Sequence, residues 1–239
     1  MCGRYASFRE DQAIADEFAV ATVADEVRLL PPSWNVAPTD GVRMVVERAD
    51  RTTGEITRQL RVARWGLVPS WAKDPSIGGR LINARVETVT DKPAFRKAAA
   101  QRRAIVPMDG YYEWQKTDAG KVPYFLTADE GTPEGLAAAG LYELWRDPSR
   151  PDDDPARWLV TVTVITTAAA DALGHIHDRT PLLLPPPLWD QWLDVALTSP
   201  DDVRSLLETV PEPHLRPREV SRAVGNVRNN GPELVEPVA

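Results

Sequence analysis

The chain has 239 residues, of which 43% are hydrophobic and 26% are charged. This composition is typical of a globular protein and excludes a disordered or collagen-like chain. No run approaches the roughly 18 consecutive apolar residues of a membrane span, and the N-terminus lacks the basic and then apolar segments of a signal peptide. We therefore expect a cytoplasmic protein with no membrane contact.

The formal net charge of −7 excludes a protein coated in basic residues for non-specific binding to duplex DNA. The charges are unevenly spread along the chain. Residues 61–110 carry ten basic and four acidic side chains, whereas residues 111–160 carry five basic and ten acidic ones. Any nucleic-acid site must therefore be local, and two solvated faces of opposite sign are the simpler interpretation.

The first half of the chain predicts a helix, a hairpin and a second helix. Ile14 and Phe18 are spaced for one face of a helix over residues 9–18, which follows an N-terminal strand. Residues 42–47 and 59–65 have strand character and flank Thr53-Gly54, which predicts a hairpin with a polar tip. Residues 93–103 form the second predicted helix, with Phe95 and Ala98 or Ala99 turned inward.

Strands dominate the middle of the chain, and two helices follow them. The strands are predicted at residues 104–106, 111–114, 123–127, 136–144 and 158–166. The helices are predicted at residues 187–194 and 200–210. We expect a single α+β domain over residues 1–239, with a barrel-like mixed or antiparallel β core and flanking helices. Residues 147–155 are expected to form an insertion loop, and the last few residues a tail.

Cys2 is the only cysteine, which excludes an intramolecular disulfide and a cysteine-based zinc site. Methionine before a small residue is normally removed, and its loss would leave an amine and a thiol on adjacent carbons. The α-amine has a reference pKa of about 7.7 to 8.0, so it can attack an aldehyde near neutral pH, and the thiol can then close a thiazolidine ring. A small buried hydrophobic residue is the alternative interpretation of Cys2.

Seven segments in the same order closely resemble the SOS-response-associated peptidase (SRAP) family. They are Met1-Cys2-Gly3-Arg4-Tyr5, Trp34 to Pro38, Arg64 to Trp71, Ile82 to Thr88, Asp109 to Trp114, His175 to Pro181 and Val220 to Val227. The resemblance implies one α+β domain, binding to single-stranded DNA, and a reversible cross-link between the N-terminal cysteine and the open-chain aldehyde of an abasic site. A bacterial member would be associated with the nucleoid.

The resemblance also implies four catalytic residues. Cys2 is the nucleophile, Asn83 orients the sugar, Glu113 is an acid/base group beside the amine, and His177 is a proton donor that opens the sugar ring and assists reversal. Each role has a physical rationale: Glu113 lies between aromatic residues that could desolvate it, and imidazole exchanges protons near pH 6.5. The alternatives are an ion pair for Glu113, a structural hydrogen bond for His177, and a turn or cap for Asn83.

Four arginines are candidates for contacts with DNA phosphates. Arg4, Arg85 and Arg179 each lie within two residues of a proposed catalytic residue, which predicts a phosphate clamp, and Arg80 adds a backbone contact. Surface ion pairs are the alternative for these side chains.

Aromatic and proline side chains are candidates for contacts with bases. Trp34, Pro38 and Trp71 are candidates for base stacking. Trp65 is expected in the core. Ala72 stands where family members often carry a second aromatic residue, so a smaller stacking platform is expected. We expect no metal, no cofactor and a monomer.

Two other classes of function remain open from the sequence. Class II glutamine amidotransferases also begin Met-Cys-Gly and use Cys2 as an N-terminal nucleophile, and a peptidase acting on its own N-terminus is a related alternative. A non-covalent binder of single-stranded DNA, with an incidental cysteine, is the second class.

Overall fold

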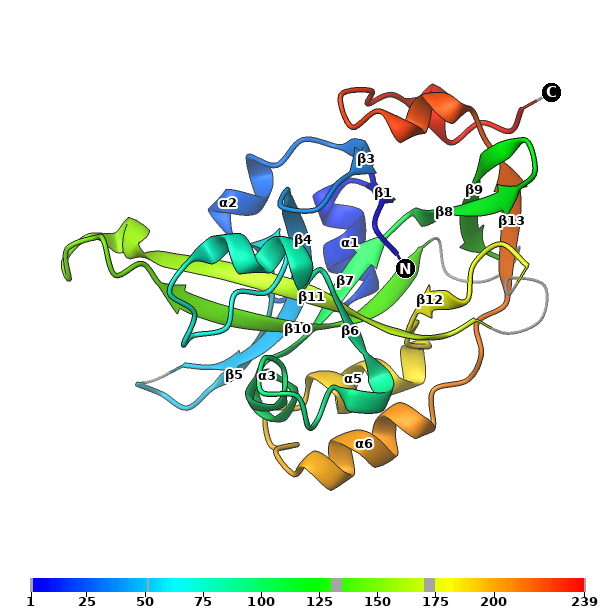
Figure 1. Cartoon of the computed structure of the whole chain (residues 1–239). Coiled ribbons are helices and arrows are strands. Elements are labelled where there is room, and N and C mark those ends of the chain that lie inside the picture. The colour runs from blue at the N-terminus through cyan, green and yellow to red at the C-terminus, as the bar shows by residue number, and fades with distance from the viewer. Residues whose placement is uncertain (1, 51, 130–134, 170–174, 239) are drawn as a thin grey trace.

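Five strands close into a mixed barrel at the centre of the computed structural model, which describes residues 2–50, 52–129, 135–169 and 175–238 (Figure 1). The barrel strands are β4 (Gly41–Ala49), β5 (Ile56–Trp65), β7 (Arg103–Met108), β10 (Leu136–Arg146) and β11 (Trp158–Ala168). Neighbours pair antiparallel except β5 and β11, whose parallel pairing through Arg64↔Thr161 and Trp65↔Val162 closes the barrel. The expected barrel-like α+β core is confirmed.

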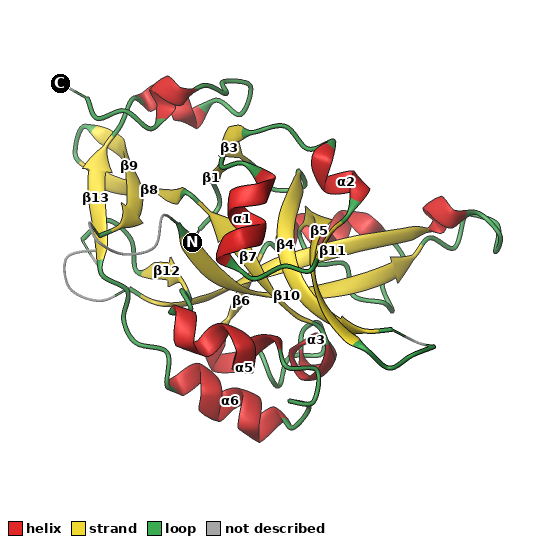
Figure 2. Ribbon diagram, turned by 180° about the vertical axis from the view of Figure 1, so that it is seen from behind, coloured by secondary structure: helices red, strands yellow, loops and turns green. Residues whose placement is uncertain are grey.

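Alternation along the barrel strands builds two hydrophobic clusters. On β4, Val42, Met44 and Val46 join one cluster, whereas Val45 joins the other. Successive strand residues point to opposite faces, so a run that is buried throughout must be covered on both sides. Helices provide one of those covers (Figure 2). They are α1 (Asp11–Glu17), α3 (Arg96–Gln101), α5 (Trp189–Leu193) and α6 (Pro200–Glu208).

A second sheet packs beside the barrel. Its strands, in spatial order, are β13 (Leu215–Glu219), β9 (Gly120–Ala128), β8 (Gly110–Thr117), β1 (Tyr5–Ser7) and β3 (Ser33–Val36). Tyr112 and Phe125 turn to its outer face and pack there with Val220, Val224 and Leu234 from the C-terminal end of the chain. Three short strands extend the barrel sheet: β2 (Thr22–Val23), β6 (Asn83–Arg85) and β12 (Arg179–Pro181).

The predicted long elements are confirmed, with boundaries shifted by a few residues. The hairpin of β4 and β5 turns near Gly54, which has a φ of +73° that suits glycine. Residues 93–103 give only the short helix α3, with Phe95, Ala98 and Ala99 buried as expected. The sequence did not predict α2 (Asp25–Arg28), the strands β2, β3, β6, β12 and β13, or the short 3₁₀ turns. The turns are η1 (Pro75–Arg80), η2 (Val86–Thr88), η3 (Pro155–Arg157), η4 (Pro186–Leu188), η5 (Arg222–Gly225) and η6 (Pro232–Leu234).

Residues 147–155 belong to the connection between β10 and β11, where the acidic run meets basic side chains. Arg150 pairs with Asp147 and Asp154, and Arg157 pairs with Asp152. Near the C-terminus, Leu234 and Val235 are the last buried residues, whereas residues 236–238 are exposed. The Val238 N–H still donates to the Glu219 carbonyl, so this exposed end lies along β13. None of the helices in the described part of the chain is long and apolar enough to cross a membrane.

Candidate active site

The two sheets meet at Cys2, which lies just before β1 and is completely buried. Its carbonyl oxygen accepts a hydrogen bond of 2.7 Å from Nδ2 of Asn83, the first residue of β6. β6 runs parallel to β11, with Asn83 opposite Val164. Asn83 therefore belongs to the barrel sheet through its pairing with β11, and its side chain contacts Cys2, which directly precedes β1 of the second sheet.

Asn83 keeps a further polar atom available in this site. Its Oδ1 is buried and has no hydrogen-bond partner among the described residues. A buried amide oxygen without a partner is costly, because it has lost its bonds to water without gaining others. Asn83 Oδ1 therefore retains an unused capacity to accept a hydrogen bond.

Glu113 lies on β8 close enough to Cys2 for its charge to act on the thiol. Burial raises the pKa of the Cys2 thiol well above its usual range, and the negative charge of Glu113 raises it further. Glu113 itself is only 4% exposed, and burial raises its pKa to about 7, although the positive N-terminus of the chain acts in the opposite direction. At neutral pH this carboxyl group can therefore both accept and donate a proton.

His177 lies just before β12 and is partly exposed. Burial lowers the pKa of its imidazole, as does the positive N-terminus, which also acts on the pKa values of Cys2 and Glu113. The Arg179 backbone N–H lies 3.0 Å from Nδ1, and the Asp178 carboxylate oxygen lies 2.9 Å from the same nitrogen. The structure therefore gathers the four predicted catalytic residues around one end of the chain.

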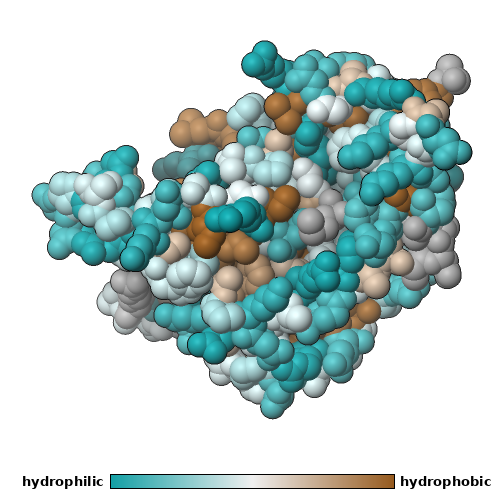
Figure 3. All heavy atoms as spheres, in the orientation of Figure 1, coloured by the Kyte–Doolittle hydropathy of each residue, from teal (hydrophilic) through white to brown (hydrophobic). Residues whose placement is uncertain are grey.

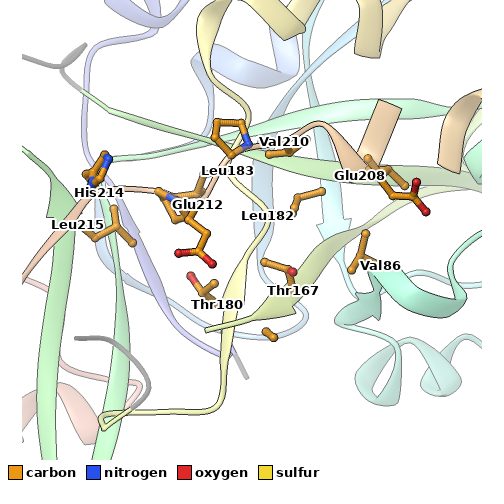
Figure 4. Close-up of a pocket in the computed structure, with 14 residues that line it drawn as sticks. Val86, Thr167, Thr180, Leu182, Leu183, Glu208, Val210, Glu212, His214 and Leu215 are labelled. Atoms are coloured by element: carbon orange, nitrogen blue, oxygen red, sulfur yellow. The ribbon is translucent and has the colours of Figure 1, made fainter. Parts of the chain in front are cut away.

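Tyr111 and Thr180, which the sequence analysis did not single out, hold β8 against β12. The Tyr111 hydroxyl and Thr180 Oγ1 are 2.8 Å apart and both residues are buried. Both lie inside the segments that resemble the family, but nothing in the residue types indicated their pairing. Thr180 also lines a hollow of about 510 Å³, in which the Glu212 carboxylate points toward Thr180 and Thr167 (Figure 4). None of the four catalytic candidates lines this hollow.

The arginines differ in how much they are already engaged. Arg80 and Arg85 are exposed. Arg4 is half-buried: its Nη1 donates to Asn35 Oδ1 at 2.6 Å and to the Val224 carbonyl at 2.9 Å, and its guanidinium lies 5.9 Å from the Trp114 ring centre. Arg179 is buried and forms an ion pair with Glu87 on η2. Arg4 and Arg179 therefore already bond to protein acceptors, whereas Arg80 and Arg85 are exposed, and the phosphate clamp stays a prediction.

The aromatic candidates also differ in exposure. Trp71 is 61% exposed. Trp34 is half-buried and stacks on Phe8 with ring centres 5.5 Å apart, and Pro38 is half-buried. Trp65 is fully buried, as expected, and its Nε1 donates to the Ile82 carbonyl. Trp71 therefore offers the most open ring of the predicted stacking residues.

A loop of the barrel sheet presents Trp71 and Arg80. Gly66 and Gly78 approach so closely that a Cβ on Gly66 would lie 2.5 Å from the Gly78 carbonyl oxygen. Trp145 Nε1 donates to the Ala72 carbonyl and ties the loop to β10. The surrounding face is mostly hydrophilic, with hydrophobic residues gathered near η1 (Figure 3).

Comparison with known proteins gives full-length relatives. The chain is 36% identical over 237 residues to the abasic site processing protein YoqW of Bacillus subtilis, covering 99% of each chain. It is 32% identical over 246 residues to the abasic site processing protein YedK of Escherichia coli, covering 100% of each.

Solved structures share the fold. A protein from Bacteroides thetaiotaomicron superposes with a TM-score of 0.81 over 100% of both chains at 22% identity. A phage-related protein from Bordetella bronchiseptica has a TM-score of 0.65 at 26% identity and covers 92% of this chain and 95% of its own. The model of the SOS response associated peptidase (SRAP) family matches residues 1–227. This chain, with Cys2 buried where its two sheets meet, belongs to that family.

Proposed function

We propose that the protein processes abasic sites in single-stranded DNA by forming a reversible covalent thiazolidine with Cys2, after removal of Met1. The observation that carries the proposal is the convergence of Asn83 and Glu113 on Cys2, with the pKa of Glu113 raised by burial to about 7. The relatives named abasic site processing proteins support the choice of substrate.

The chemistry begins with the sugar. A proton from His177 reaches the ring oxygen of the abasic sugar while the C1 hydroxyl gives its proton to water, and the ring opens to the aldehyde. The neutral α-amine of Cys2 attacks the aldehyde carbon, and one amine proton passes to the aldehyde oxygen to give a carbinolamine. Glu113 accepts the second amine proton and returns it to the hydroxyl group, which leaves as water to give an imine. Asn83 Oδ1 accepts a hydrogen bond from a sugar hydroxyl and orients the carbon toward the amine.

Ring closure forms the stable product. The Cys2 sulfur adds to the imine carbon and the imine nitrogen gains a proton, so the thiazolidine contains the elements of the imine and the thiol. Because burial and the charge of Glu113 raise the pKa of the thiol, it reacts from the S–H form and needs a base nearby. Hydrolysis reverses both steps, and no cofactor is consumed.

The proposed DNA surface combines arginines with exposed rings. Arg80 and Arg85 contact phosphates directly, Arg4 and Arg179 lie closer to the reacting sugar, and Trp71 stacks on a base with Trp34 and Pro38 beside it. The net charge of −7 confines this attraction to one face. We propose that the protein acts as a monomer.

A denaturing gel tests the covalent step. Wild-type protein incubated with an abasic single-stranded oligonucleotide is expected to give a shifted band that survives denaturation, whereas an intact oligonucleotide gives none. Cys2→Ala is expected to abolish the band, and mass spectrometry of the adduct should find Met1 absent and the sugar on Cys2. A stable adduct with Cys2→Ala, or DNA binding that never survives denaturation, would contradict the proposal. Turnover of glutamine would instead favour an N-terminal-nucleophile amidotransferase.

A further inference from the structure

Glu87 interacts with two of the arginines on the proposed DNA surface, Arg179 and Arg85. Its Oε1 lies 2.5 Å from Arg179 Nη1, and its Oε2 accepts from Arg179 Nη2 at 3.1 Å. The charge of Arg85, two residues earlier in the chain, also acts on the Glu87 carboxylate and helps to lower its pKa, after the larger effect of the Arg179 hydrogen bond. One carboxylate is therefore paired with Arg179 and also feels the charge of Arg85.

The two members of the ion pair differ in exposure. The Arg179 side chain is 10% exposed, whereas that of Glu87 is 51% exposed. A buried guanidinium requires an anionic partner, because losing it leaves an uncompensated charge in a medium of low dielectric constant. Glu87 can turn into water without that cost, so it is the replaceable member of the pair.

Arg179 need not move when its partner changes. Its Nη2 also donates to the Thr166 carbonyl at 2.6 Å and lies 3.3 Å from Thr166 Oγ1, contacts that do not involve Glu87. The planar guanidinium pairs two oxygens of a carboxylate or of a phosphate with similar geometry. A phosphate could therefore take the place of the Glu87 carboxylate on a guanidinium that stays fixed.

We propose that Glu87 is an internal substitute for a DNA phosphate: it holds Arg179 while the site is empty and is displaced by the backbone of the bound strand. This inference rests on the proposed function, since it assumes that single-stranded DNA occupies this face. Glu87 then sets the affinity, because each binding event must break its ion pair with Arg179. It also weakens the dependence of binding on salt, since one anion replaces another.

Fluorescence anisotropy with an intact single-stranded oligonucleotide tests the exchange without any covalent step. Glu87→Gln removes the competing charge and is expected to tighten binding about threefold to fivefold. The slope of log K against log salt is expected to become steeper by about 0.7, the value for one phosphate of a single strand. Glu87→Asp keeps the negative charge, but its shorter side chain loses the contact with Arg179. If this variant binds DNA more tightly than the wild type, the gain therefore comes from the lost ion pair and not from the change in net charge.

Two further variants separate the exchange from a general effect of charge. Glu208→Gln makes the same change in net charge at an exposed residue of α6 that forms no ion pair in the described part of the chain, and it is expected to tighten binding much less. In an Arg179→Ala background, Glu87→Gln is expected to give no gain beyond that of Glu208→Gln. Thermal unfolding establishes whether each variant is folded. If Glu87→Gln does not fold, the affinity of Glu87→Asp tests the exchange in its place.

The outcomes distinguish this inference from the proposed function. If the wild type forms the covalent adduct but Glu87→Gln and Glu87→Asp bind no tighter than Glu208→Gln, the exchange is wrong and the proposed function stands. A gain that persists without Arg179 also overturns the exchange. A wild type that binds no single-stranded DNA and forms no adduct overturns both.

Discussion

Glu113 is a buried carboxyl group whose pKa is far above that of an exposed glutamate. It is nearly inaccessible to water on β8, and burial raises its pKa to about 7. Between the unfolded pKa near 4.5 and the folded value, the folded protein binds more protons at this residue than the unfolded chain does. The free energy of unfolding therefore falls as the pH rises from 4.5 to about 7, and Glu113 causes no further change above that.

Replacing Glu113 with the neutral Gln is expected to remove this loss of stability. A rise in pKa from 4.5 to about 7 corresponds to at most about 3 kcal/mol of unfolding free energy. Between pH 5 and pH 8, the unfolding free energy of the wild type should therefore fall by up to that amount relative to that of Glu113→Gln. Urea unfolding at several pH values measures it. Glu55→Gln, at an exposed position of the hairpin between β4 and β5, is the control and should parallel the wild type. Parallel curves for Glu113→Gln would contradict the assignment.

The residues of the candidate site could be predicted from the sequence, through resemblance and residue chemistry. The pKa of Glu113 and the ion pair of Arg179 could not. The thiol and the carboxyl group could be named as reactive types, whereas the pKa of Glu113 depends on burial between two sheets that are distant in sequence. The partner of Arg179 could not be predicted for the same reason. Glu87 follows β6, and only the parallel pairing of β6 with β11 and the antiparallel pairing of β11 with β12 bring it to Arg179. Neither pairing leaves a local signal in the chain.

At the scale of elements, a close crossing of two backbone segments fixes the loop that carries Trp71 and Arg80. Gly66 has a φ of +120°, and its N–H donates to the Val162 carbonyl at 2.8 Å. Gly78 lies against it, so neither residue has room for a Cβ. The position of the loop therefore depends on the close contact between Gly66, directly after β5, and Gly78 in η1.

Gly66→Ala is expected to destabilise the protein by roughly 2 to 4 kcal/mol, since alanine is both strained at this φ and in collision with the Gly78 carbonyl. The same variant should weaken binding of single-stranded DNA, because the loop must shift with Trp71 and Arg80. Gly79→Ala lies in the same loop, where a Cβ would meet nothing within 4 Å, and should change stability by less than about 1 kcal/mol. Urea unfolding and anisotropy provide the two measurements. Equal effects of the two substitutions would show that the crossing does not position the loop.

The elements predicted from the sequence are those with strong local patterns. The barrel strands alternate or are continuously apolar over many residues, and the turn at Thr53-Gly54 marks a hairpin. The strands that were missed lack such patterns. β13 (Leu215–Glu219) is mostly exposed and contains Pro217, and β6 has three residues, so each is a strand only because of the neighbour it pairs with.

At the scale of the whole molecule, the C-terminal residues hold the segment around Arg4, near the N-terminus, in place. Residues 220–238, the C-terminal strap, cover the outer face of the second sheet, where Leu234 and Val235 pack with Tyr112 and Phe125. The strap carbonyl of Val224 accepts from Arg4, 220 residues earlier. The approach of Arg4 to the site therefore depends on the packing of the last residues.

Asn35 joins β3 to this strap. Its Oδ1 accepts from Arg4, and its Nδ2 lies within 3.3 Å of three strap carbonyls, those of Val224, Asn226 and Asn229. The residue is 3% exposed, so water cannot replace these bonds without a change in packing. One amide therefore couples the strap, the second sheet and a proposed DNA contact.

Asn35→Ala is expected to lower the free energy of unfolding by about 2 to 4 kcal/mol, because it removes the buried hydrogen bonds of this amide to Arg4 and to the strap carbonyls. It should also weaken binding of single-stranded DNA, since Arg4 loses one of its two hydrogen-bond acceptors. Asn226→Ala is the matched control: this exposed strap residue caps the Arg228 N–H, and its loss should cost about 0.5 kcal/mol and leave binding unchanged. Urea unfolding gives the first quantity and anisotropy the second. If Asn35→Ala were destabilised yet bound DNA as the wild type does, the strap would support the fold alone, and the position of Arg4 would be set by Trp114 and its remaining bond to Val224.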